Sequence, residues 1–216
     1  MIFLIFATLN ISMIGSLKGV ELNVIPGDSF CVIPRIGRVS RIGERILVDF
    51  GDFTNPLYYS SKIKVAVIYP ESSILNVDIL LSFSDLVFDV FSCKIKNQNF
   101  DLKFGTAKLV YNERLSERPE IYGFLSGITL INAERLTNGA MISLSGGFLN
   151  MFFDGNGGGV FNINTDGTKV NISTYRDLYL SSMGLLNIIN CTNKFKGEGV
   201  YPEIKINGNF NLINVE

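Results

Sequence analysis

The sequence contains no histidine, which removes the commonest proton-transfer and metal-binding side chain from its chemistry. Catalytic triads with a histidine base, and zinc sites built on histidine, are therefore excluded. Cys31, Cys93 and Cys191 are too widely spaced to form a CxxC pair, so a zinc ribbon or thioredoxin motif is excluded as well. In an exported protein two of these cysteines can pair and leave one over, but buried free thiols are an equal alternative.

Two glycine-rich segments carry the oxygen ligands that Ca²⁺ prefers. The stretches Asp154–Gly159 and Asn162–Gly167 resemble calcium loops, but neither has the glutamate that closes an EF-hand at its twelfth position. We expect a plain glycine turn followed by a hairpin. A calcium ion bound by Asp154, Asn156 and Asp166 is the alternative, and no other cofactor is expected.

One basic cluster stands out, made of Arg35, Arg38, Arg41 and Arg45. The two glycines within this stretch each oppose a helix by about 1 kcal/mol, so we expect strands joined by a turn. Charges on an edge strand discourage pairing with other sheets. A binding site for an anion or an acidic glycan is the alternative role of the four arginines.

Apolar and polar residues alternate along most of the chain, which is typical of β-strands. Clear examples are residues 20–24, 63–69, 77–83 and 203–212, with Asn or Lys on one side and Ile, Val or Phe on the other. This pattern predicts sheets with one face in water. We expect an all-β protein, a mainly antiparallel β-sandwich with a β-barrel as the alternative, and only short helical pieces, one of them within residues 175–186.

Asp166-Gly167 lies between two alternating segments and predicts a tight hairpin turn with Gly167 at positive φ. Asn207-Gly208 predicts a second hairpin turn or a bulge. We find no internal repeat beyond a short Arg-Ile-Gly echo at residues 35–37 and 41–43.

The chain opens with an apolar run, residues 1–14, followed by Gly15-Ser16. Its length is that of a signal peptide and falls short of the roughly 20 apolar residues of a membrane span. We expect residues 1–16 to be an export signal and residues 17–216 to form a single β domain, with any sub-division near residues 112–120. The alternative is that residues 2–9 are a buried first strand.

The charge and hydropathy of the chain argue against a nucleic-acid partner and favour a protein partner. A net charge of −1 argues against nucleic acid, which selects basic surfaces. Only 18% of residues are charged, and the mean hydropathy of +0.28 is high for a β protein in water. Such a chain suits packing against other subunits or strand addition at an open sheet edge.

The sequence therefore predicts a structural or adhesive protein of the cell envelope or exterior that acts through protein–protein packing or self-assembly and not through catalysis. Two alternatives stay open. An outer-membrane β-barrel fits the alternating segments. A carbohydrate-binding or carbohydrate-acting protein fits the aromatic side chains of Tyr58, Tyr59, Tyr175 and Tyr179.

Overall fold

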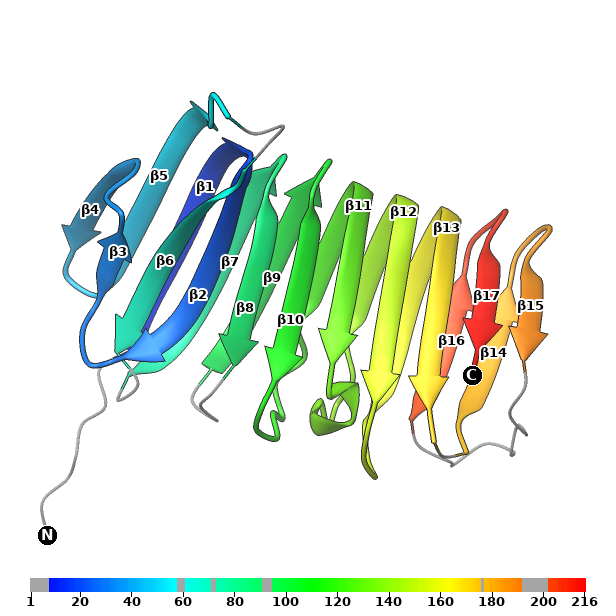
Figure 1. Ribbon diagram of the computed structural model, residues 1–216. Coiled ribbons are helices and arrows are strands. Elements are labelled where there is room, and N and C mark those ends of the chain that lie inside the picture. Colours follow the sequence, from blue (N-terminus) through cyan, green and yellow to red (C-terminus); the bar gives the residue numbers. More distant parts are fainter. Residues whose placement is uncertain (1–7, 58–60, 71–72, 91–94, 176, 192–201) are drawn as a thin grey trace, which may run out of the picture.

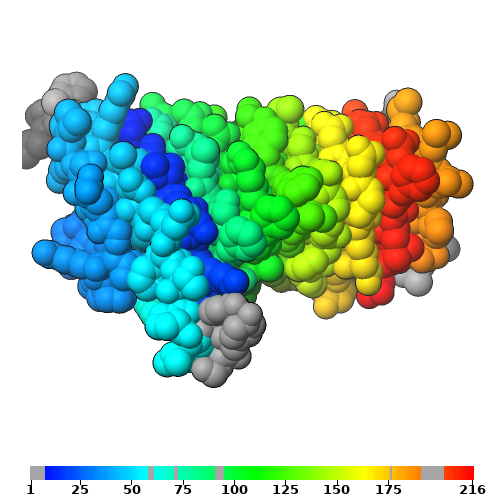
Figure 2. Space-filling view, turned by 90° about the horizontal axis from the view of Figure 1, so that it is seen from above, coloured from blue at the N-terminus to red at the C-terminus, as the bar shows by residue number. Residues whose placement is uncertain are grey.

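The computed structural model describes residues 8–57, 61–70, 73–90, 95–175, 177–191 and 202–216. The chain winds into a flattened coil, a β-solenoid, with two faces of mostly parallel strands (Figure 1). In the view from above, the coils lie side by side in one row, and the dark-blue N-terminal and red C-terminal segments lie inside its two ends (Figure 2). The described helical structure is a single 3₁₀ turn, η1 (Ala133–Arg135).

Both faces have the same strand order along the solenoid. The first face consists of β4 (Arg38–Ile42), β5 (Arg45–Thr54), β1 (Thr8–Lys18), β7 (Ile74–Ser82), β9 (Ile95–Lys103), the first halves of β11 (Glu120–Ile131), β12 (Met141–Phe153) and β13 (Val160–Thr174), then β16 (Glu203–Asn207) and β14 (Tyr179–Met183). The second face consists of β3 (Cys31–Ile33), β6 (Ile63–Pro70), β2 (Val20–Gly27), β8 (Asp85–Val90), β10 (Thr106–Tyr111), the second halves of β11, β12 and β13, then β17 (Leu212–Val215) and β15 (Ile188–Cys191).

The prediction of an all-β protein with only short helical pieces is confirmed, but a mainly antiparallel sandwich is not. Among the described strands, the pairings of β3 with β6 and of β4 with β5 are antiparallel and all others are parallel. Side chains alternate in both kinds of sheet, so alternation by itself does not report strand direction. The barrel alternative is not confirmed either, because β14 and β15 lie at one end of the sheet and β3 and β4 at the other.

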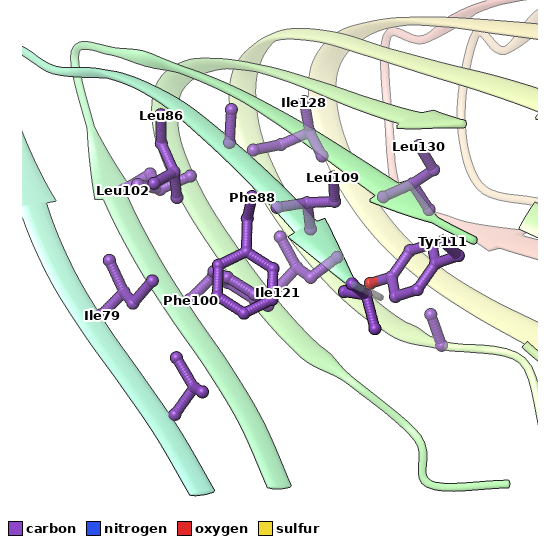
Figure 3. Close-up of a cluster of buried hydrophobic side chains, with 14 of the residues drawn as sticks. Ile79, Leu86, Phe88, Phe100, Leu102, Leu109, Tyr111, Ile121, Ile128 and Leu130 are labelled. Carbon is purple, nitrogen blue, oxygen red and sulfur yellow. The ribbon is translucent and has the colours of Figure 1, made fainter. Parts of the chain in front are cut away.

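The interior between the two faces is filled by one cluster of apolar side chains. Figure 3 shows its middle, where Phe88 of β8 and Phe100 of β9 meet from opposite faces with ring centroids 5.6 Å apart. Ile79, Ile121 and Leu109 pack around them, and all of these side chains are buried. The cluster continues past residues 112–120, where the sequence offered a boundary.

A 21-residue period sets the coil. Asn150 and Asn171 are 21 residues apart and hydrogen-bonded to each other on neighbouring coils. At the same spacing, one bend per coil joins the first face to the second, at Phe83, Phe104, Leu125, Gly146 and Gly167, all with positive φ. The side chains at this position differ, so no repeat is visible in the sequence.

Asp166-Gly167 is one of these bends and not the hairpin that we predicted. Gly167 does have positive φ, 62°. The two halves of β13 that flank it pair in parallel with β12 and with β16 and β17, and not with each other. Glycine after aspartate satisfies the backbone of either turn, and therefore the dipeptide alone does not distinguish them.

The terminal coils are tucked inside the stack. The first coil, β1 and β2, lies between the coil of β5 and β6 and the coil of β7 and β8. The last coil, β16 and β17, lies between β13 and the outermost strands β14 and β15. Each end of the solenoid is therefore built by an inner segment of the sequence (Figure 1).

This arrangement bears on the expected signal peptide. Residues 1–7 lie outside the described part of the chain, but Thr8–Lys18 is strand β1. Ile11, Met13 and Leu17 are buried in the core. A cut at Gly15-Ser16 would remove most of a strand that has a partner on each side.

Candidate functional site

A groove of about 560 Å³ crosses the outer side of the first face near the bends. Its floor is a row of side chains from successive coils that stand opposite one another in register: Asp101, Tyr122, Ser143, Asn164 and Asn207. Because these residues alternate with buried ones along each strand, they all point away from the core. The coil thus lines up an aromatic ring, a carboxylate, a hydroxyl and two amides across four strand spacings.

A second row lies two residues further along the same strands. Lys103 stands opposite Phe124, Phe124 opposite Ser145 and Ser145 opposite Asp166. The Asp166 carboxylate accepts a hydrogen bond from the backbone N–H of Asn209 at 2.9 Å, which fixes the C-terminal wall of the groove.

The phenol of Tyr122 is neutral over a wide pH range. Its hydroxyl donates to the Glu120 carboxylate, Oε2, at 3.1 Å. This hydrogen bond and the nearby negative charge raise the pKa of Tyr122, because both disfavour the phenolate. The ring is about half exposed and offers a flat apolar surface to a ligand.

Bulky side chains occupy the bend in five coils, at Phe83, Phe104, Leu125, Phe210 and Leu186, where two other coils have glycine. Phe83, Phe104 and Leu125 have φ values of 53°, 54° and 47°. The left-handed conformation costs about 1–2 kcal/mol per residue for a side chain with a Cβ. Gly146 and Gly167 show that the bend itself needs no side chain.

The rings at these bends join those of the groove. Phe83 and Phe104 stack with centroids 5.1 Å apart and an interplanar angle of 12°. Phe104 then meets Phe124 edge to face at 5.4 Å. We call Phe83, Phe104, Phe124 and Leu125 the corner ridge; each is 45–53% exposed.

The C-terminal edge of the solenoid is a second distinctive surface. Within the described part of the chain, β14 pairs with β16 and β15 pairs with β17, and the outer side of each strand has no partner. Neither strand has a charged residue or a proline (YLSSM and IINC). Several exposed apolar side chains gather on these strands and the turn between them: Met183, Leu185, Leu186, Ile188 and Ile189.

A ladder of asparagine side chains runs along the second face to this edge. Asn171 donates to Asn150 at 2.7 Å, and Asn214 donates to Asn171 at 2.8 Å. Asn190 of β15 donates to Asn214 at 3.1 Å and is exposed. Stacked amides of this kind reinforce strand pairing between neighbouring strands, and this ladder extends to the outermost described strand.

The four arginines of the basic cluster lie at the opposite end of the solenoid. Arg38 and Arg41 are on β4, Arg45 begins β5, and Arg35 precedes β4. The segment forms strands joined by a turn at Gly43, as expected. β4 is exposed along its whole length, so the cluster lies on the outermost strand of that end.

The residues of the candidate calcium site do not come together. Asp154 and Asn156 lie in the connection between β12 and β13, where the Glu134 carboxylate accepts a hydrogen bond from the Asp154 N–H at 3.2 Å. Asp166 lies six residues into β13, about 20 Å along the extended strand from its start. Among the described residues, no group of His, Cys, Asp or Glu is arranged to hold a metal ion.

The remaining residues singled out in the sequence are dispersed. Tyr175 is 88% exposed and Tyr179 is half-buried. Cys31 is a free, half-buried thiol. Tyr58, Tyr59 and Cys93, and the side chain of Cys191, lie outside the described part of the structure. Among the described residues, no helix is long and apolar enough to cross a membrane.

Sequence reasoning missed both the groove and the corner ridge, except for Asp166. The signal that identifies them is the 21-residue spacing of Asp101, Tyr122, Ser143 and Asn164, and of Phe83, Phe104 and Leu125. Because unlike residues occupy equivalent positions, this spacing gains meaning only once the coil is known.

No family model and no curated protein matches the sequence. Among solved structures, the chain is similar to a "putative cell adhesion protein" from Clostridium sporogenes ATCC 15579, with 11% sequence identity and a TM-score of 0.32. The similarity covers 97% of this chain and 92% of that chain.

Proposed function

We propose that this protein is a structural or adhesive β-solenoid of the cell envelope or exterior. It acts through contacts with other protein chains, first of all a second copy of itself, and not through catalysis. The observation that carries the proposal is the C-terminal edge, where β14 and β15 expose unpaired backbone groups and apolar side chains without a charge among them. Natural edge strands are normally protected by charges, proline or bulges, and this edge has neither a charged residue nor a proline.

A second copy is the occupant that this edge fits best. The strands β14 and β15 run in opposite directions, because each is parallel to its neighbour on its own face and the chain reverses between the faces. A two-fold axis perpendicular to the solenoid therefore brings both strands into antiparallel pairing with a second copy at once. Most oligomers use such closed two-fold contacts.

The oligomeric state of the full chain tests the proposal. We expect a dimer by light scattering coupled to size-exclusion chromatography. Ile188→Lys, or Met183→Lys, places a charge on the edge and gives a monomer of unchanged circular dichroism. A wild-type protein that is monomeric at the highest soluble concentration contradicts self-assembly.

A matched control is available at the other end of the solenoid. Ile42 of β4 is 81% exposed, more than either tested residue. Ile42→Lys adds the same charge far from β14 and β15, and the dimer is expected to persist. Loss of the dimer in this variant as well would show that general charge, and not the C-terminal edge, controls association.

The location outside the cell is a separate part of the proposal. It rests on the apolar N-terminal sequence and on a composition that is poor in charge. Because Thr8–Lys18 is a core strand, we expect export without a cut at Gly15-Ser16. Intact mass spectrometry of protein recovered from the envelope or medium tests this: a mature chain that begins at residue 16 or 17 would contradict it.

A further inference from the structure

The corner ridge has a property that the fold does not require. At the same bend of successive coils the chain places Phe83, Phe104 and Leu125, then Gly146 and Gly167, then Phe210 and Leu186, all with positive φ. Glycine adopts this conformation freely, whereas a bulky side chain is strained in it. Strain of this kind in a native structure points to a role for the side chain itself.

The exposed rings form a continuous apolar track that leads into the groove. Phe83 stacks on Phe104, and Phe104 meets Phe124 edge to face. Phe124 and Tyr122 lie on the same outer side of β11, and both line the groove. The track thus runs across three coils and ends among hydrogen-bonding groups.

The polar groups of the groove are suited to hydroxyl groups. Carboxylates come from Asp101 and Asp166, amides from Asn164 and Asn207, and a hydroxyl from Ser143. Carboxylates accept hydrogen bonds, whereas amide and hydroxyl groups both donate and accept. None of the residues that line the groove is a lysine or arginine, so an anionic ligand within it would meet the carboxylates of Asp101 and Asp166, with Lys103 beside Phe124 as a neighbouring positive charge.

We propose that the corner ridge and this groove bind an uncharged oligosaccharide. The apolar faces of its pyranose rings lie on Phe104, Phe124 and Tyr122, and its hydroxyl groups bond to the carboxylates and amides. Successive side chains within each row of the groove are about 4.8 Å apart, the spacing of neighbouring strands, and so offer repeated contacts to a chain of similar units. This site is independent of the self-association proposed above.

A peptide strand fits this surface less well. The strands under the groove, β11, β12 and β13, are paired on both edges, so they offer no free backbone to an added strand. Strand addition requires such an edge. Binding of an apolar peptide in place of sugar is therefore an outcome that would overturn the proposal.

Titration calorimetry with two β-linked neutral probes, cellohexaose and chitohexaose, tests the site. The full-length protein is used, both as wild type and as Ile188→Lys, so that association through the C-terminal edge does not enter the result. We expect at least one probe to bind both proteins equally, and polygalacturonate, which is acidic, not to bind. Failure of both neutral probes, or tighter binding of polygalacturonate, overturns the proposal.

Glycine substitutions separate binding from folding. Phe104→Gly relieves the strained φ while it removes a ring, so we expect a nearly unchanged melting temperature and about three- to tenfold weaker binding. Tyr122→Ala is expected to weaken binding by a similar factor. Leu186→Gly is the matched control, because Leu186 also has positive φ (55°) and is exposed, but lies off the groove and ridge.

Two results would contradict the role of the ridge. One is sugar binding that is unchanged in Phe104→Gly and Tyr122→Ala. The other is a large loss of melting temperature in Phe104→Gly without one in Leu186→Gly, which would mean that the stacked rings serve the fold. Binding that is lost in Leu186→Gly would place the site elsewhere.

Discussion

The two ends of the solenoid differ in how their open sheet edges are covered. At the N-terminal end, β3 and β4 pair antiparallel with the outermost coil, and Arg38 and Arg41 lie on the exposed strand β4. At the C-terminal end, no described strand covers β14 or β15, and both lack charge. A parallel coil leaves an open edge at each end, and an open edge invites pairing with another chain.

The difference suggests that one end stops the stack and the other continues it. An antiparallel strand cannot extend the coil, and its arginines repel a second copy of themselves. The C-terminal edge has neither device and extends an asparagine ladder outwards as far as Asn190. The two ends are alike only in their tucked terminal coils.

The largest loss of stability is expected from substitutions in the cores of the two tucked terminal coils. Met13 of β1 and Ile213 of β17 are fully buried in the two tucked coils. Met13→Ala and Ile213→Ala should each lower the free energy of unfolding by about 2–5 kcal/mol, because each leaves a cavity between packed neighbours. Chemical denaturation measures this. If either variant loses less than about 1 kcal/mol, that coil is only loosely attached.

Alanine substitutions at glycines of the two tucked coils should lower the stability by different amounts at the two ends of the solenoid. A Cβ on Gly208 would lie 1.6 Å from the Thr165 carbonyl oxygen, and one on Gly15 would lie 2.8 Å from the Gly51 oxygen. One on Gly167 would meet nothing within 4 Å. We expect alanine to cost about 3 kcal/mol at Gly208, less at Gly15 and about 1 kcal/mol at Gly167, by thermal unfolding. Equal losses at all three sites would mean that the close contacts at Gly208 and Gly15 do not set the cost.

Tyr111 of β10 lies between the ends and reports on the shared core. Burial raises the pKa of its phenol well above the ordinary value, so the neutral form is favoured in the folded state. Its stabilising effect is complete below about pH 10, the unfolded pKa, and is lost progressively as the pH rises above that value. Tyr111→Phe should cost about 1 kcal/mol at neutral pH, because the hydroxyl's hydrogen bond to Gln98 is lost.

The stability measured at alkaline pH distinguishes a specific effect of Tyr111 from a general destabilisation of the protein by alkali. In Tyr111→Phe the free energy of unfolding should fall less steeply above about pH 10 than in the wild type. Urea denaturation at a series of pH values gives both slopes. Parallel curves for the two proteins would show that Tyr111 does not link folding to pH.

The smallest effect on stability is expected from the arginines, although the effect on association is expected to be large. Arg38→Leu with Arg41→Leu makes β4 resemble the uncharged C-terminal edge, and should change the free energy of unfolding by less than about 0.5 kcal/mol. We expect higher oligomers by light scattering, because both ends can then pair. A variant that remains a dimer would mean that strand direction, and not charge, closes the N-terminal end.

The sequence predicted the strands better than their arrangement. Alternation correctly indicated strands at residues 20–24 and 63–69, and over all of residues 77–83 but Phe83, which forms a bend, because burial on one side acts in any sheet. It could not report strand direction, and glycine at Gly167 serves a bend as well as a hairpin. The expected short helix within residues 175–186 is wrong, since β14 occupies Tyr179–Met183; packing against β16 outweighs local preference there.

The candidate surfaces were predictable only in part. The Arg35–Arg45 segment was correctly expected as strands and a turn, because its glycines oppose a helix. The groove depends on side chains such as Asp101 and Asn207, which lie far apart in the sequence and meet through the winding of the coil. Asp166 does line a site, but with Asn209 and not with Asp154. No local pattern specifies such long-range neighbours.

The tucked terminal coils also determine how tension enters the molecule. A pull applied near Thr8 or Val215 acts first on β1 or β17, and each of these strands has a neighbour on both sides. Such a strand cannot peel away one hydrogen bond at a time from an open edge; it must slide out between two others, breaking both ladders together. The outermost strands, which would peel most easily, are fixed by inner segments of the chain and carry no load directly. A pull on β1 and β17 therefore meets its greatest resistance at the strands to which it is applied.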